Sequence, residues 1–212
     1  TSAPQTAEQL LQTEAYINLL ADYLKTADKR AYVVLSANTD YVGGIVGYAT
    51  GCSITKSNTE EGYVTGHDYV GGIAGYWTSA YGKKMTLEGD GAGNKALVQG
   101  HDYVGGIVSL CKKEMTLNHW KNEGYICASG EYAGGITGKN AGILNDCENK
   151  MPTDTQDTSH FKAMLDQYAS TASYVGGITG LNAGTITASD KTYVTSVLSG
   201  HNYVGGIVGC NL

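Results

Sequence analysis

Short apolar segments recur along most of the chain, with glycine and asparagine between them. The clearest is the pattern Tyr-(Val/Ala)-Gly-Gly-Ile, whose tyrosines lie 28, 34, 29, 42 and 29 residues apart. The three intervals of 28–29 residues indicate the length of one repeat, and the two longer intervals indicate insertions. The six copies begin at Tyr41, Tyr69, Tyr103, Tyr132, Tyr174 and Tyr203.

Two more apolar segments occur in each repeat, and both are rich in Val, Ile, Thr and Tyr, which favours short β-strands. The middle segment covers residues 53–55, 85–87, 115–117, 142–144 and 185–187. The third covers residues 63–66, 96–100, 125–127 and 193–195, with residues 32–35 ahead of the first copy. Three strands per repeat predict a triangular coil, and each strand would pair in parallel with its equivalent about 4.8 Å away.

We therefore predict an all-β fold over residues 31–212, a parallel β-helix (β-solenoid) of about six three-strand coils. The general preference of parallel crossovers predicts that the coil is right-handed.

The paired glycines predict a kink in each repeat. Val42 and Ile45 are three positions apart, so a regular strand would point them to opposite faces. A kink at Gly43-Gly44 would turn both side chains inward, and glycine accepts the backbone angles that a kink requires. A phosphate-binding loop would need a following helix and lysine, so we interpret the glycine pairs as structural.

Two segments have helical rather than strand periodicity. In the first, leucine and isoleucine recur at helical spacing between positions 10 and 24, which predicts an N-terminal helical cap over residues 1–30. Such a cap would cover the open apolar end of the first coil, although the same helix could instead bind a partner. The second is a short helical insertion at about residues 149–172.

The repeats resemble the GLUG repeat of bacterial surface proteins. The copy at residues 174–186 reads Tyr-Val-Gly-Gly-Ile-Thr-Gly-Leu-Asn-Ala-Gly-Thr-Ile, and the resemblance extends over roughly residues 32–212. The chain departs from the pattern at Ser109-Leu110, where glycine is expected, and carries Ile where the family often has Leu. The resemblance implies an adhesin-like protein, extracellular or at the bacterial cell surface. Such repeats also occur beside IgA-cleaving metallopeptidases, and the resemblance implies no catalytic residue.

Charge and composition exclude some partners. The formal net charge is -6 and Arg30 is the one arginine, which does not fit nucleic-acid binding through clustered basic residues. No apolar run approaches the roughly 18 residues of a membrane span, so we expect no membrane insertion in this segment. Because the chain starts at Thr1 rather than Met and stops within a repeat, we expect a fragment of a longer chain.

The cysteines have no metal-type spacing, and small buried core positions are their expected role. A disulfide between Cys127 and Cys147 on neighbouring repeats is an alternative that the sequence leaves open. The five cysteines are Cys52, Cys111, Cys127, Cys147 and Cys210.

The sequence predicts no catalytic residue, no cofactor and no metal site. The H-E-x-x-H zinc-peptidase motif is absent, and five scattered histidines assign no Ser–His–Asp or Cys–His set. His67, His101 and His201 share one position shortly before the repeat tyrosine, so His67 and His101 would stack on adjacent coils. A repeated turn residue explains this position more simply than a metal ligand does.

The position directly before the repeat tyrosine is acidic in four copies. A line of carboxylates at strand spacing could bind calcium or serve acid–base catalysis. However, Asp and Asn are also ordinary turn residues, and like charges at this spacing repel each other, so we interpret the line as turns. The residues are Asp40, Asp68, Asp102, Glu131, Ser173 and Asn202. The loop at residues 88–94 lacks the strict spacing of a calcium loop.

Aromatic residues outside the repeat position are the candidates for ligand binding. An exposed tryptophan on a rigid scaffold can stack on a sugar ring or anchor a protein partner. For both tryptophans, packing against loops or against the insertion of the 42-residue repeat is the favoured interpretation. The candidates are Tyr76, Trp77, Tyr81, His119 and Trp120.

These observations predict a non-catalytic structural or adhesive module of a bacterial secreted or cell-surface protein. It would bind a glycan or another surface protein, or act as a rigid stalk. The alternative is a carbohydrate-active enzyme of the β-helix type, which would need opposed carboxylates in a cleft. Self-association through an open C-terminal coil is a third hypothesis.

Overall fold

The computed structural model describes residues 34–36, 39–59, 62–150, 172–187, 194–195, 198 and 200–212. The chain divides into two units, Thr1–Tyr32 and Val33–Leu212, and the first lies outside the described residues. The predicted cap (1–30) and most of the predicted helical insertion (151–171) therefore also lie outside them. In the described part, no helix has the length and apolarity needed to cross a bilayer.

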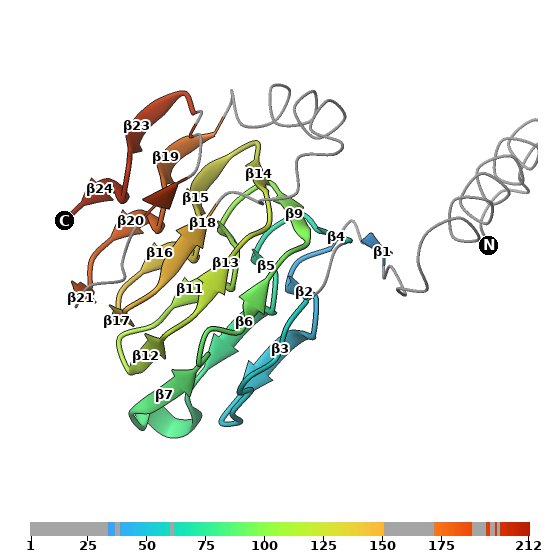
Figure 1. The fold of residues 1–212 in the computed structure, drawn as a ribbon, viewed down its shortest axis with the longest axis vertical. Helices are drawn as coiled ribbons and strands as arrows, with labels where there is room; N and C mark the ends of the chain where they lie inside the picture. The colour runs from blue at the N-terminus through green and yellow to red at the C-terminus, as the bar shows by residue number, and fades with distance from the viewer. Residues whose placement is uncertain are drawn as a thin grey trace, which may run out of the picture. The chain divides into compact units, whose positions relative to one another are not determined.

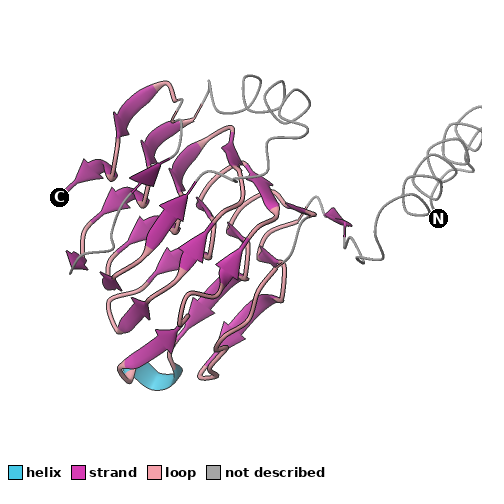
Figure 2. Cartoon of the chain, in the orientation of Figure 1, coloured by secondary structure: helices cyan, strands magenta, loops and turns pink. Residues whose placement is uncertain are grey.

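The described strands form five parallel sheets, and neighbouring strands in each sheet come from successive repeats (Figures 1 and 2). Sheet 1 contains β1 (Val34–Ser36), β4 (Tyr63–Thr65), β9 (Leu97–Gly100) and β14 (Ile126–Ala128). Sheet 2 contains β2 (Val42–Gly43), β5 (Val70–Gly71), β10 (Val104–Gly105), β15 (Glu131–Gly134), β19 (Ser173–Gly176) and β23 (Asn202–Gly205). Sheet 3 contains β3 (Val46–Thr50), β6 (Ala74–Thr78), β11 (Val108–Cys111), β16 (Thr137–Asn140), β20 (Thr179–Asn182) and β24 (Val208–Asn211).

Sheet 4 contains β7 (Met85–Glu88), β12 (Met115–Asn118), β17 (Ile143–Asn145) and β21 (Thr185–Thr187). Sheet 5 contains β8 (Gly93–Asn94), β13 (Lys121–Asn122), β18 (Glu148–Lys150) and β22 (Val194–Thr195). A single 3-10 turn, η1 (Ala80–Gly82), is the one helical element among the described residues. The predicted nearly all-β, solenoid-like fold with parallel sheets is thus confirmed.

The prediction of three strands per coil was wrong, because two coils pass through all five sheets, β5–β9 and β10–β14. The glycine pair divides the Tyr-Val-Gly-Gly-Ile segment between sheets 2 and 3. Three of the four strands of sheet 5 are short polar segments that carry no apolar signal, such as Gly93–Asn94. Two segments were also misassigned. Residues 53–55 form no strand, and Val194 and Thr195 pair with β18 in sheet 5 rather than joining sheet 1.

In the inner repeats the valine and isoleucine both point inward, as predicted for a kink at the glycine pair. Val70 and Ile73 are each 0% exposed. They belong to two different apolar clusters, with Val70 beside Val98 and Val104, and Ile73 beside Trp77 and Leu117. The glycine pair therefore lies where the chain passes from one cluster to the other.

The backbone angles at this step differ from the prediction. Positive φ falls on the repeat tyrosines, between 50° and 61°, and not on the paired glycines. The glycines are needed for close approach instead. A Cβ on Gly106 would overlap the carbonyl oxygen of Gly135 and the side-chain amide of Asn122. Only a residue without a side chain fits at this distance from a neighbouring backbone.

The asparagine ladder, formed by the buried residues Asn94, Asn122 and Asn149, lies against the second glycine of three successive pairs, Gly72, Gly106 and Gly135. The Asn94 amide donates to Asn122 Oδ1 and the Asn122 amide donates to Asn149 Oδ1, each at 2.8 Å. The Asn149 amide then donates to the Gly177 carbonyl at 2.7 Å. A buried amide without a partner costs about 1–3 kcal/mol, so the ladder ties the register of one coil to that of the next.

All five cysteines are free. Cys111, Cys127 and Cys147 are buried, as expected for core residues, and the alternative of a Cys127–Cys147 disulfide is not what the structure contains. Burial raises the pKa of each of these three thiols to about 12.

Candidate functional site

The six repeat tyrosines form a continuous tyrosine ladder along the outside of sheet 2. Neighbouring ring centroids are between 4.7 and 5.1 Å apart from Tyr41 to Tyr203. Positive φ costs an ordinary residue roughly 1–2 kcal/mol. A contact between two aromatic rings contributes about 0.5–1.5 kcal/mol, which is of similar size, so stacking offsets the strained backbone.

A second pair of rings widens the ladder at its N-terminal end. Tyr48 and Tyr76 stack at 5.2 Å, and Tyr76 lies edge-on to Tyr41 at 5.5 Å and to Tyr69 at 5.7 Å. The ammonium of Lys112 lies 4.8 Å from the centre of the Tyr76 ring. Tyr48 is 55% exposed and Tyr41 43%, so this aromatic cluster of Tyr41, Tyr48, Tyr69 and Tyr76 is open to solvent.

The line of carboxylates before the tyrosines satisfies backbone groups of the next coil. Asp40 Oδ1 accepts the N–H of Asp68 at 3.2 Å, and Asp68 Oδ1 accepts the N–H of Asp102 at 3.0 Å. Asp102 Oδ1 accepts the N–H of Glu131 at 2.6 Å. These contacts are those of turn residues. The rings of His67 and His101 stack beside this line, with centroids 5.2 Å apart and planes 3° apart, as their shared position predicted.

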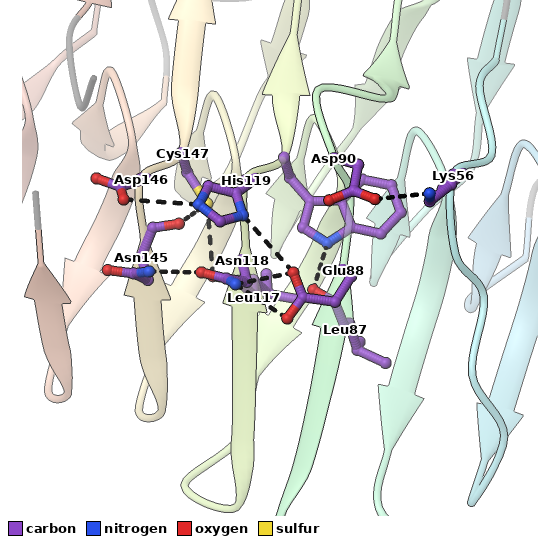
Figure 3. Close-up of polar contacts among 11 residues, drawn as sticks. Lys56, Leu87, Glu88, Asp90, Leu117, Asn118, His119, Asn145, Asp146 and Cys147 are labelled. Atoms are coloured by element: carbon purple, nitrogen blue, oxygen red, sulfur yellow. Dashed lines mark hydrogen bonds and ion pairs between the residues drawn. The ribbon is translucent and has the colours of Figure 1, made fainter. Parts of the chain in front are cut away.

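A polar groove lies where the chain leaves sheet 4. Figure 3 shows the polar contacts around His119 at this place. Its volume is about 450 Å³, and its lining includes Asp90, His119, Trp120, Lys121, Asp146 and Glu148. The ring of His119 lies between two carboxylates. His119 Nδ1 is 3.6 Å from Glu88 Oε2, and Nε2 is 3.7 Å from Asp146 Oδ2.

The groove residues come from one repeated backbone feature. Lys56, Asp90, His119 and Asp146 all have positive φ, between 46° and 54°. Such angles are uncommon outside glycine, although Asp and His adopt them more readily than most residues. This turn directs successive side chains to one edge, which is how residues from four repeats come together.

Most polar groups of the groove have partners already. Lys56 Nζ lies 2.9 Å from Asp90 Oδ2, and the hydrogen bond from Lys56 lowers the pKa of Asp90. The Asn118 amide donates to both oxygens of Glu88, at 2.9 and 2.8 Å. A general acid needs a raised pKa, so the shift at Asp90 is in the wrong direction for that role.

Among the residues that the structure describes, two groups of side chains have the composition of metal ligands. His67, Asp68 and His101 form one, and Glu88, Asp90 and His119 form the other, with ligand atoms within 4.8 Å of one another in each. The second group is held by Lys56 and Asn118, as described above. In the first group, the Asp68 carboxylate accepts the backbone N–H of Asp102. The imidazoles of His67 and His101 both lie beside the same carboxylate oxygen.

The binding residues expected from sequence lie in different environments. Trp77 and Trp120 are each 0% exposed, and their indole N–H groups donate to the carbonyls of Cys52 at 3.0 Å and Leu87 at 2.9 Å. Both rings are therefore core residues that no glycan can stack on, which corrects their place among the binding candidates. Tyr76 belongs to the aromatic cluster and His119 to the groove. Tyr81 lies in η1, and its side chain is outside the described part.

Sequence reasoning missed Tyr48 and Asp146, and it set aside Glu88 with the loop at residues 88–94. Tyr48 had a signal in the repeat alignment. Val46 pairs with Ala74, and two positions later Tyr48 pairs with Tyr76. Asp146 had none, because it follows a strand whose length varies between repeats.

Comparisons with protein-family models, with curated proteins and with solved structures found no match to this chain.

Proposed function

We propose that the chain is a non-catalytic adhesive module of a bacterial secreted or cell-surface protein, and that its aromatic cluster binds a glycan. The observation that carries this proposal is the exposure of Tyr41 and Tyr48 on a scaffold whose tryptophans are buried. Soluble proteins rarely leave a contiguous aromatic patch open without a binding role.

The chemistry of the cluster favours a sugar. Within the ladder, the ring faces are covered by neighbouring rings, so a ligand meets edges and phenolic hydroxyls there. Tyr48 stacks on Tyr76 and lies in the first described coil. Its exposed ring is available to the apolar face of a pyranose. Aromatic rings with a polar group at the tip suit ligands that have both apolar faces and hydroxyls.

The resemblance of the repeats to GLUG repeats supports the placement at a bacterial surface. We extend the same proposal to the finer architecture: a right-handed coil of about six turns, with residues 1–30 forming a helical cap and a helical insertion near 149–172.

A glycan array tests the proposal. The wild-type chain is expected to bind a subset of glycans, Tyr48→Ala to lose at least tenfold in affinity, and Tyr48→Phe to lose less because the ring remains. Tyr203→Ala is the matched control, since Tyr203 is similarly exposed at 59% but lies at the other end of the ladder. Binding that survives in Tyr48→Ala would contradict the proposed surface.

A carbohydrate-active enzyme is the second candidate, because the groove places Asp90, Asp146 and Glu148 around one pocket. Incubation with polysaccharides and detection of new reducing ends or unsaturated products tests it. We expect no turnover, and turnover that disappears in Asp146→Asn would favour the enzyme.

A further inference from the structure

The turns that lead into β5 and β10 bring the neighbouring residues His67 and Asp68 together with His101, which follows His67 by 34 residues. His67 Nδ1 and His101 Nδ1 each lie 3.4 Å from the same atom, Asp68 Oδ1. The imidazoles are stacked and nearly parallel. Two nitrogen ligands therefore approach one carboxylate oxygen from consecutive coils.

These distances match the edges of a coordination tetrahedron. Zinc binds imidazole nitrogen at about 2.0–2.1 Å and carboxylate oxygen at about 2.0–2.2 Å, which places neighbouring ligand atoms about 3.4 Å apart. Both nitrogen–oxygen edges already have this length. A ligand nitrogen of each imidazole lies within 4.8 Å of the other, and both side chains are about half exposed, at 52% and 49%. Binding of one ion turns the two rings out of their parallel stacking, so that both nitrogens face the ion.

The surroundings favour a cation and hold the ligands in place. Asp40 Oδ1 lies 3.3 Å from His67 Nδ1, and Asp102 Oδ1 lies 3.4 Å from His101 Nδ1, so carboxylates flank the site on both sides. The N–H of Asp102 fixes the orientation of the Asp68 carboxylate at 3.0 Å, as outer hydrogen bonds do in metal sites. The backbone is also fixed, because His101 N–H donates to the His67 carbonyl at 2.6 Å.

We propose that His67, Asp68 and His101 bind a divalent transition-metal ion, with Zn²⁺ as the best match, and that the ion links two consecutive coils. Imidazole with carboxylate is a ligand set for zinc rather than for calcium or magnesium, which prefer oxygen alone. A water molecule completes the fourth position. Each imidazole coordinates through Nδ1 and carries its remaining proton on Nε2.

The chain contains its own control for this site. His201 occupies the same position in a later repeat, but its neighbour is Asn202, whose amide contacts His201 Nδ1 at 2.7 Å. The carboxylate is thus replaced at an otherwise equivalent turn. Substitution of His119 tests whether the ion binds instead at Glu88, Asp90 and His119, and substitution of Cys52 tests whether it binds at the exposed thiol.

Isothermal titration of the untagged chain with ZnCl₂ tests the proposal. One ion per chain is expected to bind. His67→Ala/His101→Ala should weaken binding at least tenfold, and His201→Ala, His119→Ala and Cys52→Ser should leave it unchanged. Asp68→Asn should also weaken binding while its amide oxygen still accepts the N–H of Asp102, so the turn is kept. Circular dichroism checks that each variant is folded.

Three results would overturn the proposal: no saturable binding by the wild-type chain, unchanged binding in the double histidine variant, or loss of binding in His119→Ala or Cys52→Ser instead. A calcium titration adds a further check, because equally tight calcium binding that ignores the histidines would assign the ion to the carboxylates alone. The result is independent of the glycan proposal, since the aromatic cluster contributes no ligand.

Discussion

The asparagine ladder and the tyrosine ladder run along the same repeats, yet they have opposite environments. Asn94, Asn122 and Asn149 are buried, and each amide is hydrogen-bonded to the next coil. The tyrosines stack at 4.7–5.1 Å on the outside, and those at the two ends are exposed. The buried ladder can therefore determine register, while the exposed ladder leaves rings available for a ligand.

The largest expected effect comes from filling the space beside the asparagine ladder. Gly106→Ala would push a methyl group into the Gly135 carbonyl and the Asn122 side chain, and backbone cannot move aside as a flexible side chain can. We expect a loss of about 3 kcal/mol or more in the free energy of unfolding, measured by urea denaturation.

Gly206→Ala is the matched control. Gly206 is also the second glycine of its pair, but a Cβ there would meet nothing within 4 Å. A similar loss of unfolding free energy in both variants would mean that the glycine is needed for its backbone conformation and not for close packing against the asparagine ladder.

Removing the central amide of the buried ladder should have the next largest effect. Asn122→Ala leaves Asn149 Oδ1 without this donor and leaves the Asn94 amide with only its hydrogen bond to the Ala96 carbonyl. Each buried hydrogen-bonding group left unsatisfied costs about 1–3 kcal/mol. We expect a loss of roughly 2–4 kcal/mol in urea denaturation. Asn202→Ala, at an exposed position, should change stability by no more than about 0.5 kcal/mol. Equal effects would contradict the distinction between the buried and the exposed positions.

The buried thiols predict a loss of stability in alkali. The pKa of Cys111 and of Cys147 is raised by burial from 9.0 to about 12, so the folded chain keeps protons that the unfolded chain loses. Stability should be complete below pH 9 and should fall as pH rises toward 12, by up to about 1.4 kcal/mol per pH unit for each thiol. Urea denaturation between pH 8 and 11 measures this loss. A Cys111→Ala/Cys147→Ala variant should show a shallower dependence, and an unchanged slope would rule the thiols out.

The smallest effect should be a gain. Ser109 occupies a position where most repeats have glycine, and its hydroxyl is the buried side-chain oxygen without a hydrogen-bond partner among the described residues. Ser109→Ala removes that hydroxyl and keeps the Cβ, so stability should rise by about 1 kcal/mol. Thermal unfolding measures the change, and a lower melting temperature would show that the hydroxyl has an important contact.

The sequence predicted the parallel solenoid-like fold because the repeat tyrosine, valine and isoleucine keep a constant order. It predicted the stacking of His67 and His101 for the same reason. It did not predict sheet 5, because Asn94 and Asn122 are polar and short polar segments read as loops unless their amides are known to pair.

The binding candidates were harder to predict than the fold. Trp77 and Trp120 were named as binding candidates from their aromatic rings alone, with packing as the favoured interpretation, and both are fully buried in the structure. Glu88 and Asp146 come together at His119 only through stacking of the coils, which no local motif encodes.

The most direct test of the proposed binding surface is the affinity of Tyr48→Ala and Tyr203→Ala for a glycan that the wild-type chain binds on an array. We predict at least a tenfold loss for Tyr48→Ala and no change for Tyr203→Ala, with both variants folded by circular dichroism. Equal affinity of the two variants, or no glycan bound by the wild-type chain, would contradict the proposal that the aromatic cluster is the adhesive surface.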